Sequence, residues 1–538
     1  MVTQSRNRIL AAVLMTIACL IALGSVTVCQ TSKVRPAAVA GAFYPADPAQ
    51  LGKMVDELLA KAGGEKIDGE LLALVSPHAG YEYSGGVAAH AYALLKGRKY
   101  ERVVVISPSH IESFPFAAIY DGDAYTTPLG TLPVDKEFAA KLAGMNSLIK
   151  ISGQGHGIVE GRGEHALEDQ LPFLQRTLGQ FKLVPIVMGD QNYDLERALG
   201  VSLAKLLRGP KGSPGPGGTL IVASSDLSHF HPYDEAVKLD RKVLDGIADY
   251  DYFSLSQNFE RGIWEACGGG PIVAAMIAAE RLGANRAVVL KYANSGDLTG
   301  DKSRVVGYGA AALVAERKTR APKTLAFSLQ QKEKDALLRI ARRSVETAVK
   351  EQKFAALENG LPETLAQARG AFVTLKERGQ LRGCIGYITP SKALAETVRD
   401  VAAFAALKDT RFRPVTVAEL GQLEYEVSVL SPLRRVTDFK QIRVGRDGLV
   451  VRKGEFEGLL LPQVPVEQGW DRQTFLEQTC VKAGLPTNAW QDEETDVFAF
   501  SAIVFGEHTR VQPAGEDEDP DAARRAPPGG LEQGPPRP

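Results

Sequence analysis

The first part of the chain alternates short apolar runs with stretches whose apolar residues recur at helical spacing. The apolar runs cover residues 71–76, 102–107, 182–188, 219–223, 287–292 and 305–314. Near-continuous apolar strands between helices are typical of a parallel sheet that helices cover on both faces. The pattern therefore predicts an α/β domain over residues 34–316, with a mostly parallel sheet sandwiched by helices.

A different pattern begins near residue 329. Apolar residues recur at helical spacing from Leu337 to Val349, and Ser328 stands where it could cap such a helix. Strand-like runs then alternate with two further helical stretches. The runs cover 371–376, 381–387, 423–430, 449–452 and 498–505, and the helices lie near 393–406 and 472–483. This mixture predicts a separate α+β domain over residues 329–510.

The segments outside these two domains have their own compositions. Residues 317–328 are charged and contain a proline, which indicates a linker, and residues 511–538 have the composition of a disordered tail. In residues 1–31, two arginines precede a long uncharged run, the pattern of a signal peptide or membrane anchor. Val28 precedes Cys29, whereas a lipoprotein signal has a small residue before that cysteine. The segment could therefore be cleaved, lipidated or retained in the membrane.

This amino-terminal segment also predicts where the protein resides. We expect a membrane-anchored or exported protein, such as a periplasmic protein or a lipoprotein. The alternative is an anchor that leaves both domains on the cytoplasmic face of the membrane.

Charge and cysteine content narrow the classes of function. The chain has 63 lysines and arginines against 64 aspartates and glutamates, so no overall positive field attracts nucleic acid. It also lacks a basic tract with interleaved aromatic residues, and we expect no nucleic-acid partner. The five cysteines form neither a disulfide framework nor a CxxC zinc pattern, so each one has to be judged by its own surroundings.

Polar residues follow three of the predicted strands of the first domain. His78 and His110 each follow one strand, and Asp226 and His229 follow a third. Open α/β sheets assemble ligand sites at the carboxyl ends of their strands. A single histidine in such a domain is more often a structural residue than a ligand. The convergence of these four polar residues on one predicted sheet edge nevertheless favours a functional site.

Cys267 and His165 have different settings. Cys267 opens a glycine-rich turn that runs into an apolar helix, where the helix dipole favours the thiolate form. A thiolate binds metal or attacks an electrophile, although the same residue could be an inert buried thiol. His165 and Glu168 are three residues apart on a predicted helix, so they would share a face and could orient a ligand or relay a proton. Together with His78 and His110, Cys267 predicts a mononuclear metal site.

Five ordered motifs of the first domain resemble one known family. They are SPHAGYEYSG, SPSH, EHALEDQLPF, SSDLSHF and ACGGGPI. This set resembles the Memo family, also called AmmeMemoRadiSam system protein B, whose fold is shared with class III extradiol dioxygenases. The resemblance implies that His78, His110 and Cys267 are metal ligands. It also implies that Asp226, His229 and His165 line the pocket, where His229 or His165 would act as acid or base and Asp226 would orient a ligand or substrate.

The predicted ligands narrow the choice of metal ion but do not identify a single one. Replacing the carboxylate of a two-histidine, one-carboxylate site with a thiolate softens the site, which suits copper as well as iron(II), and zinc also fits. A redox-active metal protein acting on a small-molecule or peptide substrate is therefore the first hypothesis. The alternative is a non-catalytic scaffold that binds metal or peptide, because fold similarity alone does not establish dioxygenase activity.

The second domain resembles the AMMECR family, AmmeMemoRadiSam system protein A. The motifs are LRGCIGYI, ALKDTRFRPVT, LEYEVSVLSP, LLLPQVPVEQGWD and FLEQTCVKAGLP. Cys384 beside Arg382 could be a low-pKa nucleophile, or RGCIG could be a tightly packed strand. Asp409 and Arg411 could form a structural ion pair or belong to the same cleft, and Cys480 falls on the apolar face of a helix as a core residue.

The family name also implies a partner, a radical S-adenosylmethionine protein. Such a protein needs a cysteine cluster for its iron–sulfur centre, and no CxxxCxxC motif occurs in this sequence. The partner would therefore be a separate chain.

Overall fold

The computed structural model describes residues 32–63, 67–208, 218–316 and 328–507. These residues form two compact units. The first unit contains the chain up to Val237 together with Ala266–Glu316, and the second contains Lys238–Glu265 and the chain from Arg317 onward. The predicted signal or anchor segment, the predicted tail and nearly all of the predicted linker lie outside the described residues. Among the described helices, none is long and apolar enough to cross a membrane.

The first unit is built on a nine-stranded sheet. The strands are β2 (Glu70–Ser76), β3 (Arg102–Pro108), β4 (Ala117–Ile119), β7 (Ile149–Ile151), β10 (Lys182–Met188), β11 (Thr219–Ser224), β12 (His229–His231), β13 (Arg286–Asn294) and β14 (Val305–Ala315). Their order is β12-β14-β2-β11-β3-β10-β4-β7, and β13 also pairs with β14. All six apolar runs predicted for this domain lie within strands.

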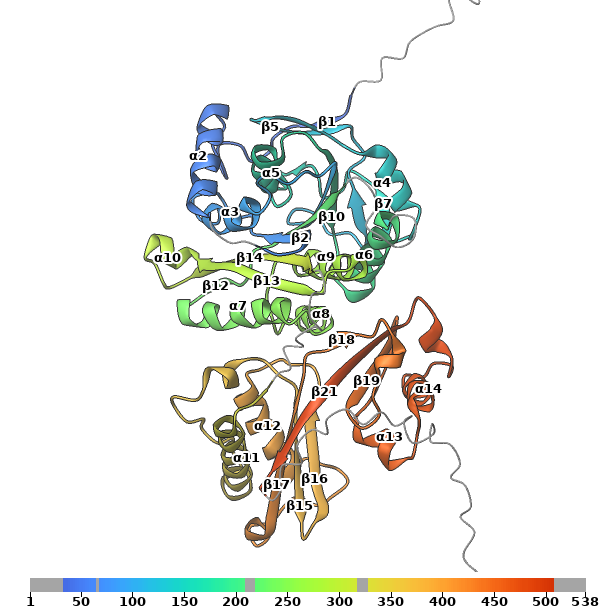
Figure 1. Cartoon of the computed structure of the whole chain (residues 1–538). Coiled ribbons are helices and arrows are strands. Elements are labelled where there is room, and N and C mark those ends of the chain that lie inside the picture. The colour runs from blue at the N-terminus through green and yellow to red at the C-terminus, as the bar shows by residue number, and fades with distance from the viewer. Residues whose placement is uncertain (1–31, 64–66, 209–217, 317–327, 508–538) are drawn as a thin grey trace, which may run out of the picture. The chain divides into compact units, whose positions relative to one another are not determined.

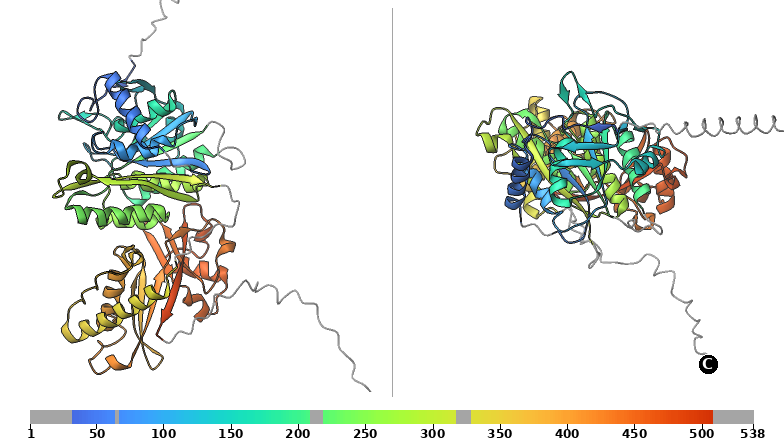
Figure 2. Two further views of the ribbon diagram at one scale, coloured as in Figure 1. Left: turned by 60° about the vertical axis from the view of Figure 1, so that its left-hand side comes forward. Right: turned by 90° about the horizontal axis from the view of Figure 1, so that it is seen from above.

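The sheet is mixed, whereas the sequence predicts a mostly parallel one. Its four central strands, β2, β11, β3 and β10, run parallel to one another. On either side of them, β14 runs antiparallel to β2 and β4 runs antiparallel to β10. The long strands β13 and β14 form an antiparallel hairpin, seen side by side in Figures 1 and 2. An apolar run has the same pattern in either direction, so strand polarity at the edges cannot be predicted from it.

Helices pack on both faces of this sheet. On one face, α2 (Pro48–Lys61), α3 (Gly85–Ala93) and α5 (Leu171–Leu178) share a core with the side chains of Val103 and Val105. The alternate residues Val104 and Ile106 are completely buried on the other face. There α9 (Gly269–Leu282) packs against β2, β11 and β3, and α6 (Tyr193–Leu207) packs on α9.

The remaining elements of the first unit are short, apart from α7. They are β1 (Val34–Arg35), β5 (Ala124–Thr127), β6 (Gly130–Pro133), α4 (Lys136–Ala143), β8 (Ile158–Val159), β9 (Arg162–Gly163), η1 (Glu168–Gln170) and α10 (Ser295–Thr299). Strands β1, β5 and β6 form a small separate sheet. The helix α7 (Tyr233–Ala248) begins in the first unit and ends in the second, which also contains α8 (Tyr252–Glu260).

The second unit has a seven-stranded antiparallel sheet. Its strands are β15 (Ala371–Glu377), β16 (Gln380–Tyr387), β17 (Leu423–Leu430), β18 (Arg434–Arg435), β19 (Asp447–Lys453), β20 (Phe456–Leu460) and β21 (Asp496–Gly506). The order is β16-β15-β17-β21-β19-β20, and β18 pairs with β21. Each pairing is antiparallel. The predicted α+β composition is therefore confirmed for the described part of this unit.

Two helices cover one end of this second sheet. The helices α11 (Gln331–Glu351) and α12 (Leu394–Leu407) share a core with β15 and β17. The helix cap predicted at Ser328 is wrong, because α11 starts after Gln330. That residue and Glu333 form a reciprocal capping box. A second, smaller core lies between β19 and α14 (Arg472–Lys482), close to α13 (Gln463–Glu467).

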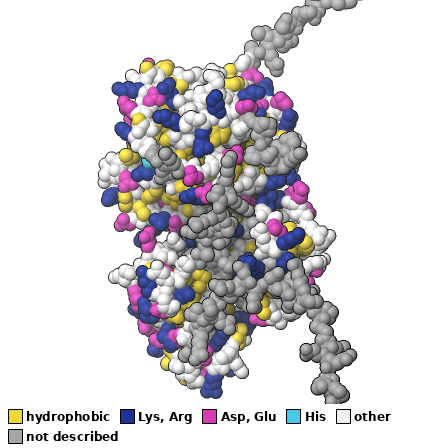
Figure 3. Space-filling model, viewed as in Figure 1, with side chains coloured by type: hydrophobic (Ala, Val, Ile, Leu, Met, Phe, Trp, Pro, Cys, Tyr) yellow, Lys and Arg dark blue, Asp and Glu magenta, His cyan; other side chains and the backbone are white. Residues whose placement is uncertain are grey.

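The described residues on the face seen in Figure 3 form no large region of a single charge. Figure 3 shows basic and acidic side chains interspersed over the described residues of that face. This distribution agrees with the formal net charge of −1.

Candidate metal centre

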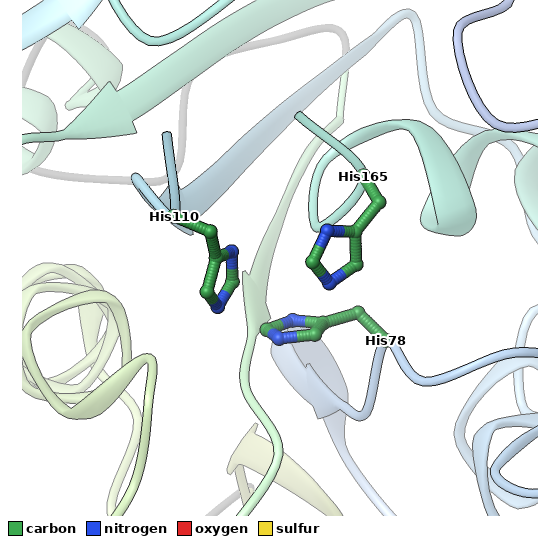
Figure 4. Close-up of side chains that lie close together, drawn as sticks. All are labelled: His78, His110 and His165. Carbon is green, nitrogen blue, oxygen red and sulfur yellow. The ribbon is translucent and has the colours of Figure 1, made fainter. Parts of the chain in front are cut away.

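Three histidine side chains converge in the first unit. His78, His110 and His165 each offer a ligand atom, and these atoms all lie within 4.8 Å of one another. Figure 4 shows the three rings turned toward a common point. The His110 and His165 ring centroids are 4.6 Å apart, and His78 meets each of them edge-on at slightly longer distances. Such a cluster can hold a single metal ion.

The sheet brings two of these histidines together. His78 lies two residues beyond the end of β2, and His110 lies two residues beyond the end of β3. Both strands pair in parallel with β11, so their carboxyl ends meet at the same edge. His165 comes from the loop before η1 rather than from a helix.

Hydrogen bonds fix the tautomer of His78. Its Nδ1 lies 2.8 Å from Ser224 Oγ. The Ser224 hydroxyl donates its hydrogen to Ala166 O at 2.6 Å and accepts from Gln170 Nε2 at 2.8 Å. With its only hydrogen already used, Ser224 can only accept from His78, so Nδ1 carries the proton and Nε2 offers its lone pair. Burial, assisted by the neighbouring histidines, lowers the pKa of His78 well below its ordinary value and keeps the ring neutral.

A carboxylate fixes His110 in the same way. Glu164 Oε1 lies 3.0 Å from His110 Nδ1, and Glu164 Oε2 accepts from the His110 backbone N–H at 2.6 Å. Burial alone would raise the pKa of Glu164, but the hydrogen bonds that it accepts from His110 and from the Ala166 backbone hold the pKa below its ordinary value. An ionised carboxylate only accepts, so His110 Nδ1 donates and its Nε2 is free to bind a metal.

Cys267 contacts one member of the cluster. Its Sγ lies 3.1 Å from His78 Nε2 and accepts from the Asp226 backbone N–H at 3.2 Å. The residue precedes α9, whose amino terminus is capped by Gly268. Burial raises the pKa of the thiol well above its ordinary value, and the charge of Asp226 adds to the rise. The predicted lowering by the helix dipole is therefore outweighed by burial, although a coordinating metal would remove the proton.

Asp226 and His229 border the cluster. Asp226 Oδ1 accepts from the His78 backbone N–H at 2.8 Å, and burial raises the pKa of this carboxyl to about 7. His229 Nδ1 lies 2.8 Å from Leu227 O, which requires that this nitrogen donates. His229 is also close enough for its charge to lower the pKa of His165, which burial chiefly brings to about 4. Both residues are thus positioned to exchange protons or contact a ligand near the cluster.

Glu168 does not belong to the site, so the predicted shared face with His165 is wrong. Glu168 begins the short helix η1 and forms a buried ion pair with Arg35 at 2.5 Å. It also accepts hydrogen bonds from Tyr44 Oη and from the Ala38 backbone N–H. The orienting carboxylate is Glu164, whose only sequence signal is its position directly before His165.

Cys384 of the second unit lies on the edge strand β16. Its Sγ accepts from Thr374 Oγ1 at 3.2 Å. Its backbone N–H donates to Asp409 Oδ2 at 2.8 Å, and Arg411 donates to its carbonyl oxygen at 3.2 Å. The Asp409–Arg411 ion pair thus satisfies the outer edge of the strand at this residue. Arg382, the predicted activating residue, instead donates to Glu419 at 2.8 Å.

The other residues of the RGCIG segment, and Cys480, have packing roles. A Cβ at Gly383 would lie 2.2 Å from Ala405 O, and one at Gly386 would lie 2.2 Å from the Phe372 ring. Cys480 is completely buried in the smaller core of the second unit.

Comparison with known proteins places both parts of the chain. The family model of the Memo-like proteins matches residues 35–312, and that of AMMECR1 matches residues 338–505. A MEMO1 family protein of Methanopyrus kandleri is 37% identical over 51% of this chain and 97% of its own length. A second MEMO1 family protein, from Sulfolobus acidocaldarius, is 38% identical over the same shares.

Solved structures are also similar to parts of this chain. The crystal structure of an uncharacterized protein from Pyrococcus horikoshii is 43% identical, with a TM-score of 0.32. The match covers 34% of this chain and 95% of that one. The family models and the curated relatives agree: this chain belongs to the Memo family and carries an AMMECR1 domain after its Memo-like domain.

Proposed function

We propose that the first unit binds a single redox-active metal ion and acts on a small-molecule or peptide substrate. The observation that carries the proposal is the fixed tautomer of two histidines. His78 and His110 both bear their proton on Nδ1, which is held by Ser224 and Glu164, so both Nε2 atoms face the cluster. Metal-binding histidines in proteins are oriented by the same kind of hydrogen bond.

Cys267 is the third ligand in this proposal. Its Sγ lies 3.1 Å from His78 Nε2. Two ligands of one tetrahedral ion, with bonds of about 2.0 and 2.3 Å, lie roughly 3.5 Å apart, so the pair is close to ligating distance. Support also comes from the resemblance of ACGGGPI to the Memo family. His165 is the rival third ligand, because it belongs to the group of mutually close ligand atoms that leaves Cys267 out.

The exposed side of the cluster is where a substrate would approach. The side chains of His110 and His165 are 30% and 20% exposed, whereas His78 is 1% exposed. Bound iron(II) or copper would supply electron transfer and Lewis acidity, as in the extradiol dioxygenase-like fold that the resemblance implies, and zinc would supply Lewis acidity alone. Asp226, with a pKa of about 7, His229 and His165 would bind the substrate or hold its proton.

The AMMECR1 domain and the amino-terminal segment enter the proposal only by resemblance and sequence pattern. We place the protein in a pathway with a separate radical S-adenosylmethionine protein, held at a membrane or exported by residues 1–31. Cys384 is a thiol nucleophile in the same proposal, with Arg411 as the neighbouring cation. The alternative is a scaffold that binds metal or peptide without turnover.

Metal analysis of the anaerobically purified full chain tests this proposal. We expect about one iron or copper ion per chain, strongly reduced in His78→Ala and in Cys267→Ser, because each loses a ligand. His165→Ala is the matched variant and should retain the metal. Loss in His165→Ala with retention in Cys267→Ser would make His165 the third ligand. Undiminished metal in His78→Ala would refute the site. Metal binding without oxygen uptake on any substrate tested would favour the scaffold.

A further inference from the structure

We propose that Glu164 is the positioning residue of this centre, holding His110 for metal binding and providing the negative charge behind it. This inference rests on the proposed metal site. It concerns a residue that touches no metal itself and acts through His110.

Both oxygens of the Glu164 carboxylate accept hydrogen bonds. Its Oε1 accepts from His110 Nδ1 and from the backbone N–H groups of His165 and Ala166, each at 3.0 Å. Its Oε2 accepts from the His110 backbone N–H at 2.6 Å. The two oxygens of Glu164 thus face four N–H donors. A glutamine amide in this place would direct its own N–H groups at one of these donors.

One carboxylate therefore holds two of the three clustered histidines. It fixes both the backbone and the ring of His110, and it fixes the backbone of His165. Glu164 lies 54 residues from His110 along the chain, so it joins the loop after β3 to the loop before η1. Arg35 supports this second loop by donating to Glu164 O at 2.6 Å.

The charge of Glu164 matters because an imidazole that binds metal through a ring nitrogen is neutral and brings no charge of its own. Glu164 is 1% exposed, and among the described residues no lysine or arginine forms an ion pair with its carboxylate. Glu168 nearby is already neutralised by Arg35. A cation bound by His110 Nε2 would thus have an unneutralised carboxylate on the opposite side of the same ring, which raises the basicity of the ligand.

The test measures metal affinity and the His110 tautomer in the full chain. Iron(II) and copper(I) are titrated in competition with a chelator for the wild type and for Glu164→Gln, Glu164→Asp and Glu112→Gln. The last is a control that removes the same charge from the loop that carries His110, where Glu112 accepts from the Gly155 backbone N–H at 2.5 Å. Nitrogen NMR of the metal-free proteins reports which His110 nitrogen carries the proton.

We expect Glu164→Gln to weaken metal binding by roughly 10- to 100-fold and to lose the Nδ1–H form of His110. Glu164→Asp should give an intermediate affinity, because it keeps the charge but shortens the side chain. Glu112→Gln should match the wild type. Glu164→Gln with wild-type affinity and tautomer would overturn the inference; if that variant does not fold, Glu164→Asp with wild-type affinity would do so. A wild type that binds no metal overturns the proposed function instead, while the tautomer still reports on Glu164.

Discussion

Arg35 is predicted to be a major stabilising residue of the first unit, although it lies in a strand of two residues. Its guanidinium is 5% exposed and pairs with the buried Glu168 at 2.5 Å. It also donates to His156 O at 2.5 Å and to Glu164 O at 2.6 Å. The substitution Arg35→Met keeps a long side chain but removes all of these bonds.

The expected loss of folding stability follows from the groups that lose their partner when Arg35 is replaced. Glu168 would stay buried without its ion-pair partner, with Tyr44 and two backbone N–H groups as its remaining partners. Removing one partner of a buried ion pair typically costs about 3–5 kcal/mol. In a domain of this size each kcal/mol lowers the melting temperature by about 2–4 °C, so a decrease of roughly 6–20 °C is expected.

Calorimetry of the full chain measures this effect as a shift in the transition of the first unit. Arg176→Met is the matched control, because Arg176 pairs with Asp56 on the surface and should contribute at most about 1 kcal/mol. Adding Glu168→Gln to Arg35→Met should recover part of the loss, since the uncompensated charge is then gone. A shift for Arg35→Met no larger than that of Arg176→Met would show that the buried ion pair does not stabilise the first unit.

Three further predictions concern separate parts of the chain. Gly383→Ala should lower the melting temperature of the second unit by several degrees in calorimetry, because its Cβ would lie 2.2 Å from Ala405 O. Cys480→Ser should destabilise the same unit by about 1–3 kcal/mol in urea unfolding, because a hydroxyl would enter the core, whereas Cys384→Ser on the partly exposed strand should be nearly neutral. The metal-free wild type should lose stability relative to Asp226→Asn as pH rises from about 4 to 7, since the folded state keeps the Asp226 proton up to a pKa of about 7 and the unfolded state releases it near 3.9.

The long strands could be predicted from the sequence because each is an uninterrupted apolar run. The three-residue strands β4, β7 and β12 could not, since they are too short to show a period. Strand β12 also contains Phe230 at a φ of 63°, a left-handed conformation unusual for an aromatic residue. These short strands form through contacts between distant segments, so no local sequence pattern predicts them.

Part of the candidate site was predictable for a simple geometric reason. His78 and His110 follow strands that end at the same sheet edge, so their convergence follows from the predicted fold. The residues that fix their tautomers were missed. Ser224 lies 146 residues from His78 along the chain, and Glu164 lies 54 residues from His110. Hydrogen bonds between such distant residues depend on loop paths that the apolar pattern does not encode.

Loop paths also explain why the cation beside Cys384 is not the one that the sequence predicted. Arg382 was the nearest cation along the strand, yet its guanidinium donates to Glu419. The cation at Cys384 is Arg411, which reaches the strand from a separate loop and is held there by Asp409. Proximity in sequence therefore pointed to Arg382, whereas the cation that contacts Cys384 in the structure is Arg411.

X-ray absorption at the metal edge of the full chain, loaded anaerobically with iron(II), tests which atoms bind the metal. We expect imidazole nitrogens from His78 and His110 and one sulfur at about 2.3 Å. The sulfur signal should disappear in Cys267→Ser, and most of the bound iron should disappear in His78→Ala. A metal surrounded only by oxygen atoms, or a spectrum unchanged by His78→Ala, would contradict the assignment of this centre.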